Sequence, residues 1–469
     1  MNSNSPRLRF APSPTGYLHV GGLRTALYNF FIAKHFSGSL VLRIEDTDQN
    51  RLVENAEENL IKMLKWAGVN FDEGPHISNQ KYGPYRQSER LHIYKKYYLR
   101  LIEKQLAYPC FYSADRINDL ATGKITSEDA TIEDEIYKDF ILSEVLEKMK
   151  KEKFVVRLKI PKNESIEYTD LVKGTVKFDL NLISDPILIK SDGFPTYHFA
   201  NVIDDHLMKI THVVRGEEWL PSIPKHIVLY NSLGWEKPQF AHLPLLLNDD
   251  KSKLSKRKND VSIESYIDKG YTKEALVNFL SLLGWHEKGD KEIYNFNELI
   301  NSFSLDRVNK SGAIFDVQKL NSFNNYYIKN YETNQLKLLL VNFVPKSWEL
   351  TDEIIDLVKD KAVTLADFKN LLQFLFEDII LTEQHQEIIN LDISQKICKS
   401  FLDEFNNKKP LKIIAQNVQQ NTSCTPKEFW NITRISLTGN EHGPSLDAIL
   451  KIYGSTKVNA LIKNVLKKT

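Results

Sequence analysis

The feature that most constrains the fold of this chain is the succession of strand, glycine-containing turn, helix and strand near its start. Apolar residues form a short strand-like run over residues 8–11, and apolar residues at helical spacing follow over 19–36. A second strand is predicted over 39–44 and another helix over 54–67. Two strands joined through a helix form a parallel βαβ unit with a right-handed crossover. We therefore expect a doubly wound α/β domain, whose ligands bind at the carboxyl ends of the strands.

The α/β pattern is interrupted and then resumes. After a predicted helix over 88–106, a charged helical stretch and short strand-like runs indicate an inserted α+β segment, at 133–151, 154–160, 174–178 and 187–189. The α/β pattern returns with strands at 211–215 and 240–247 and a helix at 220–233. From residue 262 the pattern is helical, with helices predicted in the last part at 354–363, 371–381, 394–405 and 458–465. These changes divide the chain into segments 1–107, 108–192, 193–261, 262–325 and 326–469.

Charge and cysteine content exclude several classes of protein. The 469 residues carry 62 Lys and Arg against 61 Asp and Glu, which argues against indiscriminate binding of polyanions. Three scattered cysteines, Cys110, Cys398 and Cys424, exclude a site of four cysteine ligands and make a disulfide framework unexpected. The first residues lack the apolar core of a secretion signal, and no run is long and apolar enough to span a bilayer. We expect a cytoplasmic protein that does not enter membranes.

The turn after the first strand, residues 16–22, is a candidate phosphate site. His19, Gly21 and Gly22 stand at the predicted start of the following helix. Glycines there let a flat ligand approach the backbone, and the free N–H groups of a helix start attract phosphate oxygens. The imidazole of His19 could donate a hydrogen bond to a phosphoryl oxygen as charge develops on it. Taken alone, the run is more often a plain turn before a helix, and it matches neither the dinucleotide fingerprint nor the P-loop.

A second candidate is the basic run KSKLSKRK over residues 251–258, which follows the last predicted α/β strand and a turn at 248–250. A basic run of this kind is usually a solvated loop. Its position after a strand of the same domain weakens that interpretation, and Lys253 and Lys256 could then reach a triphosphate and neutralise a leaving pyrophosphate.

Polar residues at the ends of other predicted strands could form a pocket for a small substrate. Glu45, in the run RIEDTD, could bind an ammonium group, or it could be a helix cap or part of a loop ion pair. Asp46 and Asp48 are interpreted as caps. The runs at 191–201 and 215–219 combine polar residues with tyrosine and tryptophan, as in sites for amino acids or nucleosides. Taken alone, these runs are more often core aromatic residues and surface charge.

Six segments occur together in one order along the chain: APSPTGYLHVGG, LRIEDTD, GPYRQSER, GFPTYHFAN, VVRGEEWLPSIPKH and KLSKRK. In this combination the chain resembles bacterial-type glutamyl-tRNA synthetases, which are class I aminoacyl-tRNA synthetases. The resemblance covers nearly the whole chain and is strongest over residues 9–254. It implies a class I Rossmann-like catalytic domain (1–107 and 193–261) split by an α+β insertion that binds the acceptor end of tRNA (108–192). It also implies a helical stem-contact domain (262–325) and an all-α anticodon-binding domain (326–469).

The resemblance also implies roles for individual residues. Residues 19–22 match the HIGH motif, with Gly22 in place of a second histidine, and residues 253–257 match the KMSKS motif. The implied catalytic residues are His19, Lys253 and Lys256. The implied glutamate-binding residues are Arg9, Ala11, Ser13, Glu45, Tyr197, Asn201 and Arg215. The implied ATP-binding residues are His19, Gly21, Gly22, Glu218, Trp219, Lys253, Leu254, Ser255, Lys256 and Arg257. Forked guanidinium groups and a carboxylate suit a substrate with two carboxylates and one ammonium.

The implied reaction is ATP-dependent activation of L-glutamate to glutamyl-adenylate, followed by transfer to the 3′-terminal adenosine of tRNA(Glu). Mg²⁺ is expected on the triphosphate, and tRNA is expected to be bound before the first step proceeds. Some relatives bind zinc in the insertion through closely spaced cysteines, but Cys110 stands alone there, so no zinc is expected. The class resemblance suggests a monomer.

Other functions stay open at this point. The enzyme could also charge tRNA(Gln), which depends on anticodon-facing side chains that the sequence does not identify. A small-molecule nucleotidyltransferase of the same fold, or a truncated relative that glutamylates a tRNA base, is disfavoured by the long helical tail. A catalytically inactive tRNA-binding paralogue is disfavoured by a set of residues that are all present: Arg9, His19, Glu45, Arg215, Lys253 and Lys256.

Overall fold

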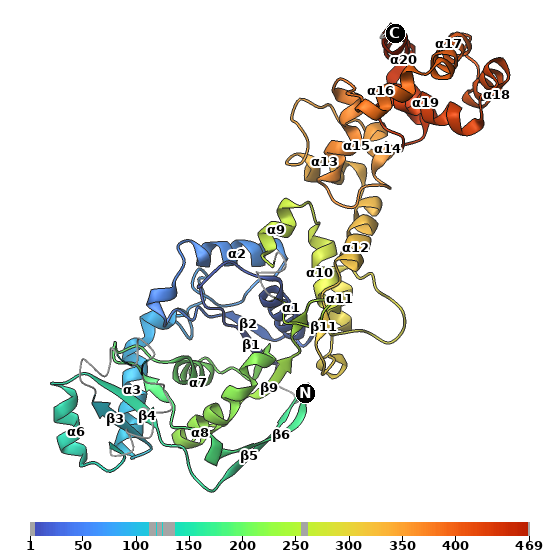
Figure 1. Ribbon diagram of the computed structural model, residues 1–469. Helices are drawn as coiled ribbons and strands as arrows, with labels where there is room; N and C mark the ends of the chain where they lie inside the picture. Colours follow the sequence, from blue (N-terminus) through green and yellow to red (C-terminus); the bar gives the residue numbers. More distant parts are fainter. Residues whose placement is uncertain (1–4, 112–118, 120–123, 125–136, 255–260, 468–469) are drawn as a thin grey trace. The chain divides into compact units, whose positions relative to one another are not determined.

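The computed structural model describes residues 5–111, 119, 124, 137–254 and 261–467 (Figure 1). The chain divides into two compact units. The first unit comprises Met1–Ser265 and Leu276–Asp316, and the second comprises Tyr266–Ala275 and Val317–Thr469. Among the described residues, no helix is both long and apolar enough to cross a membrane.

The first unit contains the predicted parallel βαβ arrangement. Strand β1 (Arg7–Phe10) pairs in parallel with β2 (Ser39–Leu42), and helix α1 (Val20–His35) connects them. A second parallel pair consists of β8 (His212–Gly216) and β9 (Gln239–Leu243), connected through α8 (Ile223–Leu233). The two pairs adjoin, because the N–H of Thr211 donates to the carbonyl of Arg7 at 2.9 Å. The α/β prediction is therefore confirmed.

The helices of this α/β part pack on the strands through apolar faces. Eleven of the α1 residues are buried, which shows that α1 is covered on nearly all sides. The other helices are α2 (Ala56–Trp66), α3 (Leu91–Glu103) and α7 (Tyr197–Leu207), with short 3₁₀ turns η1 (Gln49–Arg51), η2 (Gln87–Arg90) and η5 (Glu217–Ser222). Helix α7 was not predicted, since the run at 191–201 was read as polar residues at a strand end. The first apolar residues of α7, Phe199 and Ala200, are both fully buried.

The insertion has the predicted α+β character. Strands β3 (Ala107–Phe111), β4 (Phe154–Leu158) and β7 (Ile187–Ile189) form an antiparallel sheet in the order β3-β4-β7. Strands β5 (Ser165–Asp170) and β6 (Gly174–Asp179) form a hairpin (Figure 1), and α6 (Leu142–Met149) and η4 (Leu180–Leu182) complete the segment. Two strands were not predicted: β3, which is buried along its whole length and contains Pro109, and β5, whose exposed positions are polar. Part of the helix predicted over 133–151 lies outside the described residues.

The chain from residue 240 to 316 contains shorter elements than predicted. The strand predicted over 240–247 is broken, with β9 ending at Leu243 and β10 covering Leu246–Leu247. The break falls at Pro244, which has no N–H, and the N–H of Leu245 donates to Glu217 instead of to a strand. Strand β10 pairs in parallel with β11 (Ala313–Ile314). The remaining elements are α9 (Ile263–Asp268), α10 (Lys273–Leu282), α11 (Phe296–Ser302) and η6 (Leu305–Arg307).

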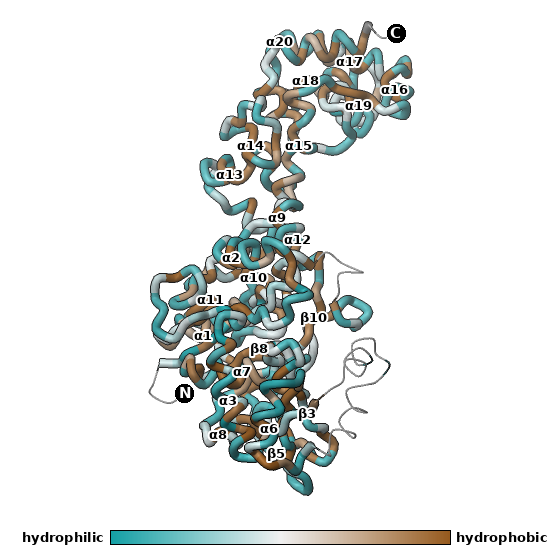
Figure 2. The backbone as a smooth tube through the Cα atoms, turned by 90° about the vertical axis from the view of Figure 1, so that its left-hand side faces the viewer, coloured by the Kyte–Doolittle hydropathy of each residue, from teal (hydrophilic) through white to brown (hydrophobic). Residues whose placement is uncertain are grey.

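The second unit is helical throughout its described residues. Its further helices are α12 (Val317–Asn330), α13 (Thr333–Leu340), α14 (Asp352–Val358), α15 (Asp367–Phe376), α16 (Glu383–Asn390), α17 (Asp392–Asn406), α18 (Leu411–Thr422), α19 (Pro426–Thr438) and α20 (Leu446–Lys467). Both hydropathy colours run along these helices in Figure 2, as expected of helices with one buried side. The predicted helices of the tail all lie within or overlap these elements. The helix predicted at 458–465 is the end of α20, which bends at Gly454, where φ is 66°.

Candidate active site

The turn between β1 and α1 is built around His19. His19 is the N-cap of α1, and its Nδ1 accepts the N–H of Gly22 at 3.0 Å. A Cβ placed on Gly21 would lie 3.2 Å from this imidazole, and one on Gly22 would lie 3.0 Å from Leu18, so both positions favour glycine. The imidazole is exposed at the start of a sixteen-residue helix, where backbone N–H groups and the helix dipole favour an anion.

The first residues of the basic run form a hairpin with β10. The N–H of Leu254 donates to the carbonyl of Leu246 at 2.9 Å, and the amide of Asn248 donates to Ser252 Oγ at 2.9 Å, which closes the hairpin. Lys253 is exposed on this hairpin. A Cβ on Gly21 would lie 3.9 Å from Leu246 Cδ1, so β10 runs beside the start of α1. The hairpin and the His19 turn therefore belong to one region of the first unit.

The remaining predicted residues of the basic run, Ser255, Lys256 and Arg257, lie outside the described residues. The described chain that resumes at residue 261 pairs with the His19 turn. The N–H of Val20 donates to the carbonyl of Val261 at 2.8 Å, and the N–H of Ile263 donates to Leu18 at 3.1 Å.

A cluster of buried charged side chains lies where the ends of β1 and β2 meet α7. Arg43 is fully buried, and its two Nη atoms lie 2.6 Å from Asp205 Oδ1 and 2.9 Å from Glu45 Oε1. Arg9 Nε lies 3.2 Å from the same Asp205 oxygen. Asn201 on α7 donates to Glu45 Oε1 at 3.0 Å. Residues from β1, from the end of β2 and from α7 thus converge, although Arg9 and Asp205 are 196 positions apart.

Burial and pairing act differently on the two carboxyl groups of this cluster. Burial raises the pKa of Glu45, and the nearby Arg43, Arg9 and Asn201 oppose that rise without cancelling it. At Asp205 burial also favours the neutral form, but the charges and hydrogen bonds of Arg9 and Arg43 outweigh it and lower the pKa. Asp205 is therefore a fixed carboxylate that holds the two guanidinium groups.

Several atoms of this cluster point to a place for a ligand. Within the described residues, Glu45 Oε2 accepts no hydrogen bond, and the terminal nitrogens of Arg9 donate none. A buried charge is costly when it is only partly satisfied. These atoms are therefore suited to an ammonium and a carboxylate supplied from outside the protein.

Arg215 forms a second anchor, on β8. Its Nη1 donates to the hydroxyl of Tyr197 at 2.6 Å, and its Nη2 donates to the carbonyl of Trp219 at 3.3 Å. The rings of Tyr197 and Trp219 lie 4.2 Å apart and form an aromatic wall. Burial is the largest influence on Tyr197 and raises its pKa, so the phenol stays neutral and can donate its proton. Each terminal nitrogen of Arg215 retains one further N–H for a substrate carboxylate.

The other predicted residues lie around these two anchors. The N–H of Glu45 donates to the carbonyl of Pro12 at 2.9 Å, which brings the turn containing Ala11 and Ser13 beside Glu45. Ser13 is exposed and Ala11 partly buried. Glu218 and Trp219 lie on η5, directly after the β8 strand that carries Arg215, and Trp219 is 39% exposed.

Sequence analysis missed residues that support the site. Arg43 and Asp205 were not singled out, although both lie within quoted or neighbouring runs. Behind them, Asp204 accepts hydrogen bonds from Arg90 at 2.7 Å and Gln87 at 2.9 Å, which joins α7 to the GPYRQSER segment. Asp46 was predicted to be a cap, but it is not at the N-cap position of a described helix and instead accepts the N–H of Ser88 at 2.8 Å from another segment. Asp48 lies at the N-cap position of η1, but its side chain makes no capping hydrogen bond. A pair of adjacent aspartates within an otherwise apolar helical run was the signal that could have indicated buried partners.

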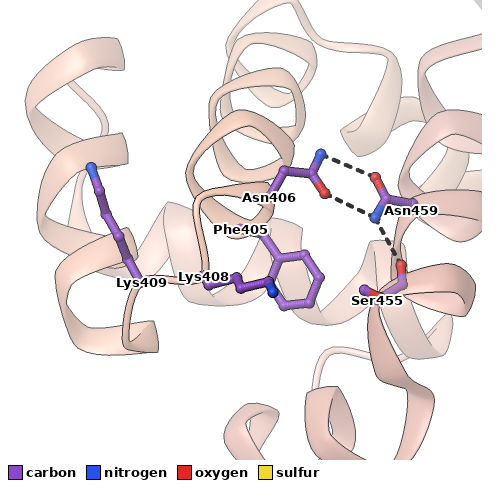
Figure 3. A pocket seen from close by; sticks show the side chains of 6 residues that line it. All are labelled: Phe405, Asn406, Lys408, Lys409, Ser455 and Asn459. Atoms are coloured by element: carbon purple, nitrogen blue, oxygen red, sulfur yellow. Dashed lines mark hydrogen bonds between the residues drawn. The ribbon is translucent and has the colours of Figure 1, made fainter.

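A separate hollow of about 360 Å³ lies in the second unit (Figure 3). Asn406 and Asn459 bond to each other across it, with amide distances of 3.1 and 3.0 Å, and Lys408 and Lys409 stand at its edge. The two amides satisfy each other, and none of the residues that the sequence analysis proposed for catalysis or binding lines this hollow.

The cysteines and metal-ligating residues give no metal centre within the described part of the chain. In those residues no group of three or more His, Cys, Asp or Glu side chains could hold an ion. Cys110 is buried on β3 and packs with Tyr108 and Val155. Cys398 and Cys424 are buried in the second unit and unpaired with each other.

Comparison with known proteins places these features in a family context. The model of the catalytic domain of class I tRNA synthetases (E and Q) matches residues 6–322, and an anticodon-binding domain model matches residues 327–466. A glutamate–tRNA ligase of Alkaliphilus metalliredigens is 40% identical over 490 residues, covering 98% of this chain and 99% of that protein. One of Chloroherpeton thalassium is 41% identical over 499 residues, covering 100% and 99%.

A solved structure is also similar along the whole chain. It is a glutamate tRNA ligase from Elizabethkingia meningosepticum in complex with its amino acid, with a TM-score of 0.87 and 32% identity. The similarity covers 99% of this chain and 99% of that one.

Proposed function

This chain belongs to the glutamate–tRNA ligase family of class I aminoacyl-tRNA synthetases, and from that premise we propose how it works. We propose that it activates L-glutamate with ATP to glutamyl-adenylate and transfers the glutamyl group to tRNA(Glu). The observation that carries this proposal is the cluster of buried charged side chains in the first unit, Arg9, Arg43, Glu45 and Asp205, with Arg215 as a second anchor. The guanidinium groups of Arg9 and Arg215, together with the oxygen of Glu45 that accepts no hydrogen bond, complement a substrate that has two carboxylates and one ammonium.

We assign the pocket residues as follows. Arg9 and Arg215 bind the two carboxylates of glutamate, and Glu45 binds its ammonium through Oε2. Tyr197 donates to a substrate oxygen and forms a wall of the pocket with Trp219. Asn201 fixes Glu45 from α7. Ala11 and Ser13 line the pocket from the turn that follows β1.

The chemical step takes place beside the start of α1. An oxygen of the α-carboxylate attacks the α-phosphorus of ATP, a P–O bond forms, and the bond to pyrophosphate breaks. His19 and the backbone N–H groups of Gly21 and Gly22 stabilise the charge on the phosphoryl oxygens. Lys253 and Lys256 neutralise the leaving pyrophosphate, and the ATP site is completed by Leu254, Ser255, Arg257, Glu218 and Trp219. Mg²⁺ enters with the triphosphate as part of the substrate rather than as a resident ion.

Transfer to tRNA completes the reaction. The 2′-hydroxyl of the terminal adenosine attacks the acyl carbonyl of the adenylate, and AMP leaves with the bonding electrons of the mixed anhydride. We assign residues 108–192 to the acceptor end, 262–325 to the tRNA stem and 326–469 to the anticodon. Because the total charge is close to neutral, tRNA binding depends on local basic patches and should weaken as salt is added.

The protein acts as a monomer in the cytoplasm in this proposal. The alternative specificity, charging of tRNA(Gln) as well as tRNA(Glu), is decided by the second unit. An inactive tRNA-binding paralogue is disfavoured, because such a protein would have no need of a buried pocket with hydrogen-bonding capacity left unused.

Two assays test the proposal. Pyrophosphate exchange with glutamate, measured with and without tRNA, should appear only when tRNA is present. Charging of purified tRNA(Glu) and tRNA(Gln) side by side should give glutamyl-tRNA(Glu), and the second tRNA decides the specificity. Binding of tRNA without any exchange or charging would contradict the proposal and identify the inactive paralogue.

A further inference from the structure

Arg215 has a partner on its inner side that the proposed reaction does not use. Strands β8 and β9 pair in parallel with Arg215 opposite His242, which puts both side chains on the same face of the strand pair. Arg215 Nε lies 3.1 Å from His242 Nε2. His242 is completely buried, and so is Asp170 at the end of β5, whose Oδ2 lies 2.6 Å from His242 Nδ1. The three groups form one chain of hydrogen bonds.

The order of donors along this chain is fixed by the chemistry of its ends. A guanidinium can only donate, so His242 Nε2 must accept from Arg215. The proton of the neutral imidazole is then on Nδ1, where it donates to the carboxylate of Asp170. Burial lowers the pKa of His242, and the positive charge of Arg215 lowers it further. Together they outweigh the hydrogen bond and charge of Asp170, which raise the pKa, so the net shift agrees with a neutral ring.

Asp170 is held by its own backbone surroundings. Its Oδ1 accepts the N–H groups of Val172 at 3.0 Å, Lys173 at 2.9 Å and His242 at 3.2 Å. Burial alone would raise the pKa of Asp170, but the bonds from His242 and from this backbone outweigh burial and lower it. Asp170 is therefore an anchored acceptor that cannot turn away from the imidazole.

We propose that Asp170 and His242 are positioning residues that hold Arg215 with its terminal nitrogens turned to the glutamate carboxylate. This inference rests on the proposed role of Arg215 in binding glutamate. His242 occupies the Nε side of the guanidinium, while Tyr197 and Trp219 each take one N–H of the terminal nitrogens. The free N–H groups that remain form a forked edge for a carboxylate. Without His242 the guanidinium could rotate, and the forked edge would be lost.

The test uses three variants of the full-length enzyme in tRNA-dependent pyrophosphate exchange. His242→Leu removes the acceptor for Arg215 and should raise the KM for glutamate about tenfold to hundredfold, the range for a lost hydrogen bond to a charged group. The KM for ATP should change less than about twofold, because the ATP site is not involved. His242→Gln can still accept from Arg215 through its amide oxygen and should recover much of the glutamate affinity.

Asp170→Asn is the sharper variant, because an amide can keep the shape but can present its NH₂ to Nδ1. The ring would then carry its proton on Nε2, facing the Nε–H of Arg215, and two donors would meet. Asp170→Asn should therefore raise the KM for glutamate at least as much as His242→Leu does. In the His242→Gln background the same change should matter little, since the glutamine amide can still turn its oxygen to Arg215. Residues that were merely structural would not show this suppression.

Controls separate this inference from the proposed function. His212 is a second buried histidine, and it lies on β8. His212→Gln should leave the KM for glutamate unchanged. Arg215→Lys should raise that KM. If Arg215→Lys has no effect, the proposed glutamate site is wrong. If Arg215→Lys raises the KM and the His242 and Asp170 variants do not, only the positioning role is wrong.

Should His242→Leu or Asp170→Asn fail to fold, the wild-type protein still provides a test. In ¹⁵N-histidine-labelled enzyme the signal that disappears in His242→Gln belongs to His242. At neutral pH it should show a protonated Nδ1 and an unprotonated Nε2. The opposite tautomer or an imidazolium would overturn the inference.

Discussion

The two sides of the proposed active site differ in how their charged residues are held. On the amino-acid side, Arg9, Arg43, Glu45 and Arg215 are all less than a tenth exposed and bond to one another or to neighbouring protein groups. On the nucleotide side, His19, Glu218 and Lys253 are exposed on turns and a hairpin. Burial makes an unpaired charge expensive, so the amino-acid side must be fully organised before substrate binds.

This difference in burial indicates that selectivity for the amino acid originates on the buried side and reaction rate on the exposed side. A small substrate is recognised through a few charges, and a preformed buried pocket penalises any substrate that leaves those charges unpaired. The exposed lysines act on charge that develops only during the reaction. Substitutions on the amino-acid side should therefore change stability and glutamate affinity together. Those on the nucleotide side should chiefly change turnover, with a loss of stability only where the side chain also caps a helix, as His19 does.

The largest expected effect is on stability, from Arg43→Met. Methionine keeps the apolar contacts of the stem but leaves Asp205 and Glu45 without their shared cation. The free energy of unfolding should fall by about 3–5 kcal/mol, the cost of breaking a buried ion pair from one side. Urea unfolding followed by tryptophan fluorescence measures it.

The control for that prediction is Lys34→Met in the Lys34–Asp72 pair, whose side chains are 34% and 40% exposed. This exposed pair should contribute less than about 1 kcal/mol. Equal losses in the two variants would show that the buried cluster has no special structural role.

The second prediction concerns the nucleotide side, through Lys253→Ala. Removal of one positive group from the leaving pyrophosphate should lower the turnover of pyrophosphate exchange about a hundredfold. The melting temperature should stay the same, because Lys253 is exposed. Lys251→Ala, on the same hairpin, is the matched control and should change turnover little. A comparable loss of turnover in Lys251→Ala would mean that the total positive charge of the hairpin matters rather than the position of Lys253.

A third prediction uses the raised pKa of Glu45. Ammonium binding needs the carboxylate, so kcat/KM for glutamate at saturating ATP should fall roughly tenfold per pH unit below that pKa. The fall should begin above the ordinary glutamic acid value of 4.5. Because the folded pKa lies above the unfolded one, the same group should make folding more favourable as pH decreases through it.

Glu45→Gln provides the comparison for the pH profile. This variant should have a weaker but nearly pH-independent affinity for glutamate until the substrate carboxylates themselves protonate. An unchanged acid limb in Glu45→Gln would assign the titration to another group.

The smallest expected effect is at the start of α1. His19→Ala should lose the cap on Gly22 and cost about 1 kcal/mol of stability as well as turnover. His19→Asn should keep the cap and still lose turnover, since the amide cannot reproduce the reach of the imidazole. Thermal unfolding and pyrophosphate exchange on both variants separate the two roles; full activity in His19→Asn would reduce His19 to a structural cap.

The fold was predictable where periodicity is strong and local. The βαβ start, the second parallel pair and the helical tail follow from short apolar runs and from apolar residues at helical spacing. The failures have physical reasons as well. Strand β3 contains Pro109, a residue that is uncommon inside strands, and helix α7 begins with the polar and aromatic residues that had been interpreted as a strand end.

The site was predictable only in part. Each motif taken alone could also have had a purely structural role. The assignment of Arg9, Glu45 and Arg215 came from the combination of six motifs along the chain. Arg43, Asp205 and the Asp170–His242 pair could not be found in this way, because their roles arise from burial beside residues 72 to 196 positions away.

The most direct test of the central claim compares glutamate with glutamine as substrates for charging tRNA(Glu). The two amino acids have nearly the same shape, and they differ in whether a guanidinium of the buried pocket meets a carboxylate or an amide. The ratio of kcat/KM values should favour glutamate by more than about a thousandfold, because glutamine would leave a buried cation without its counter-charge. Comparable charging with both amino acids would contradict a preformed pocket for a dicarboxylate.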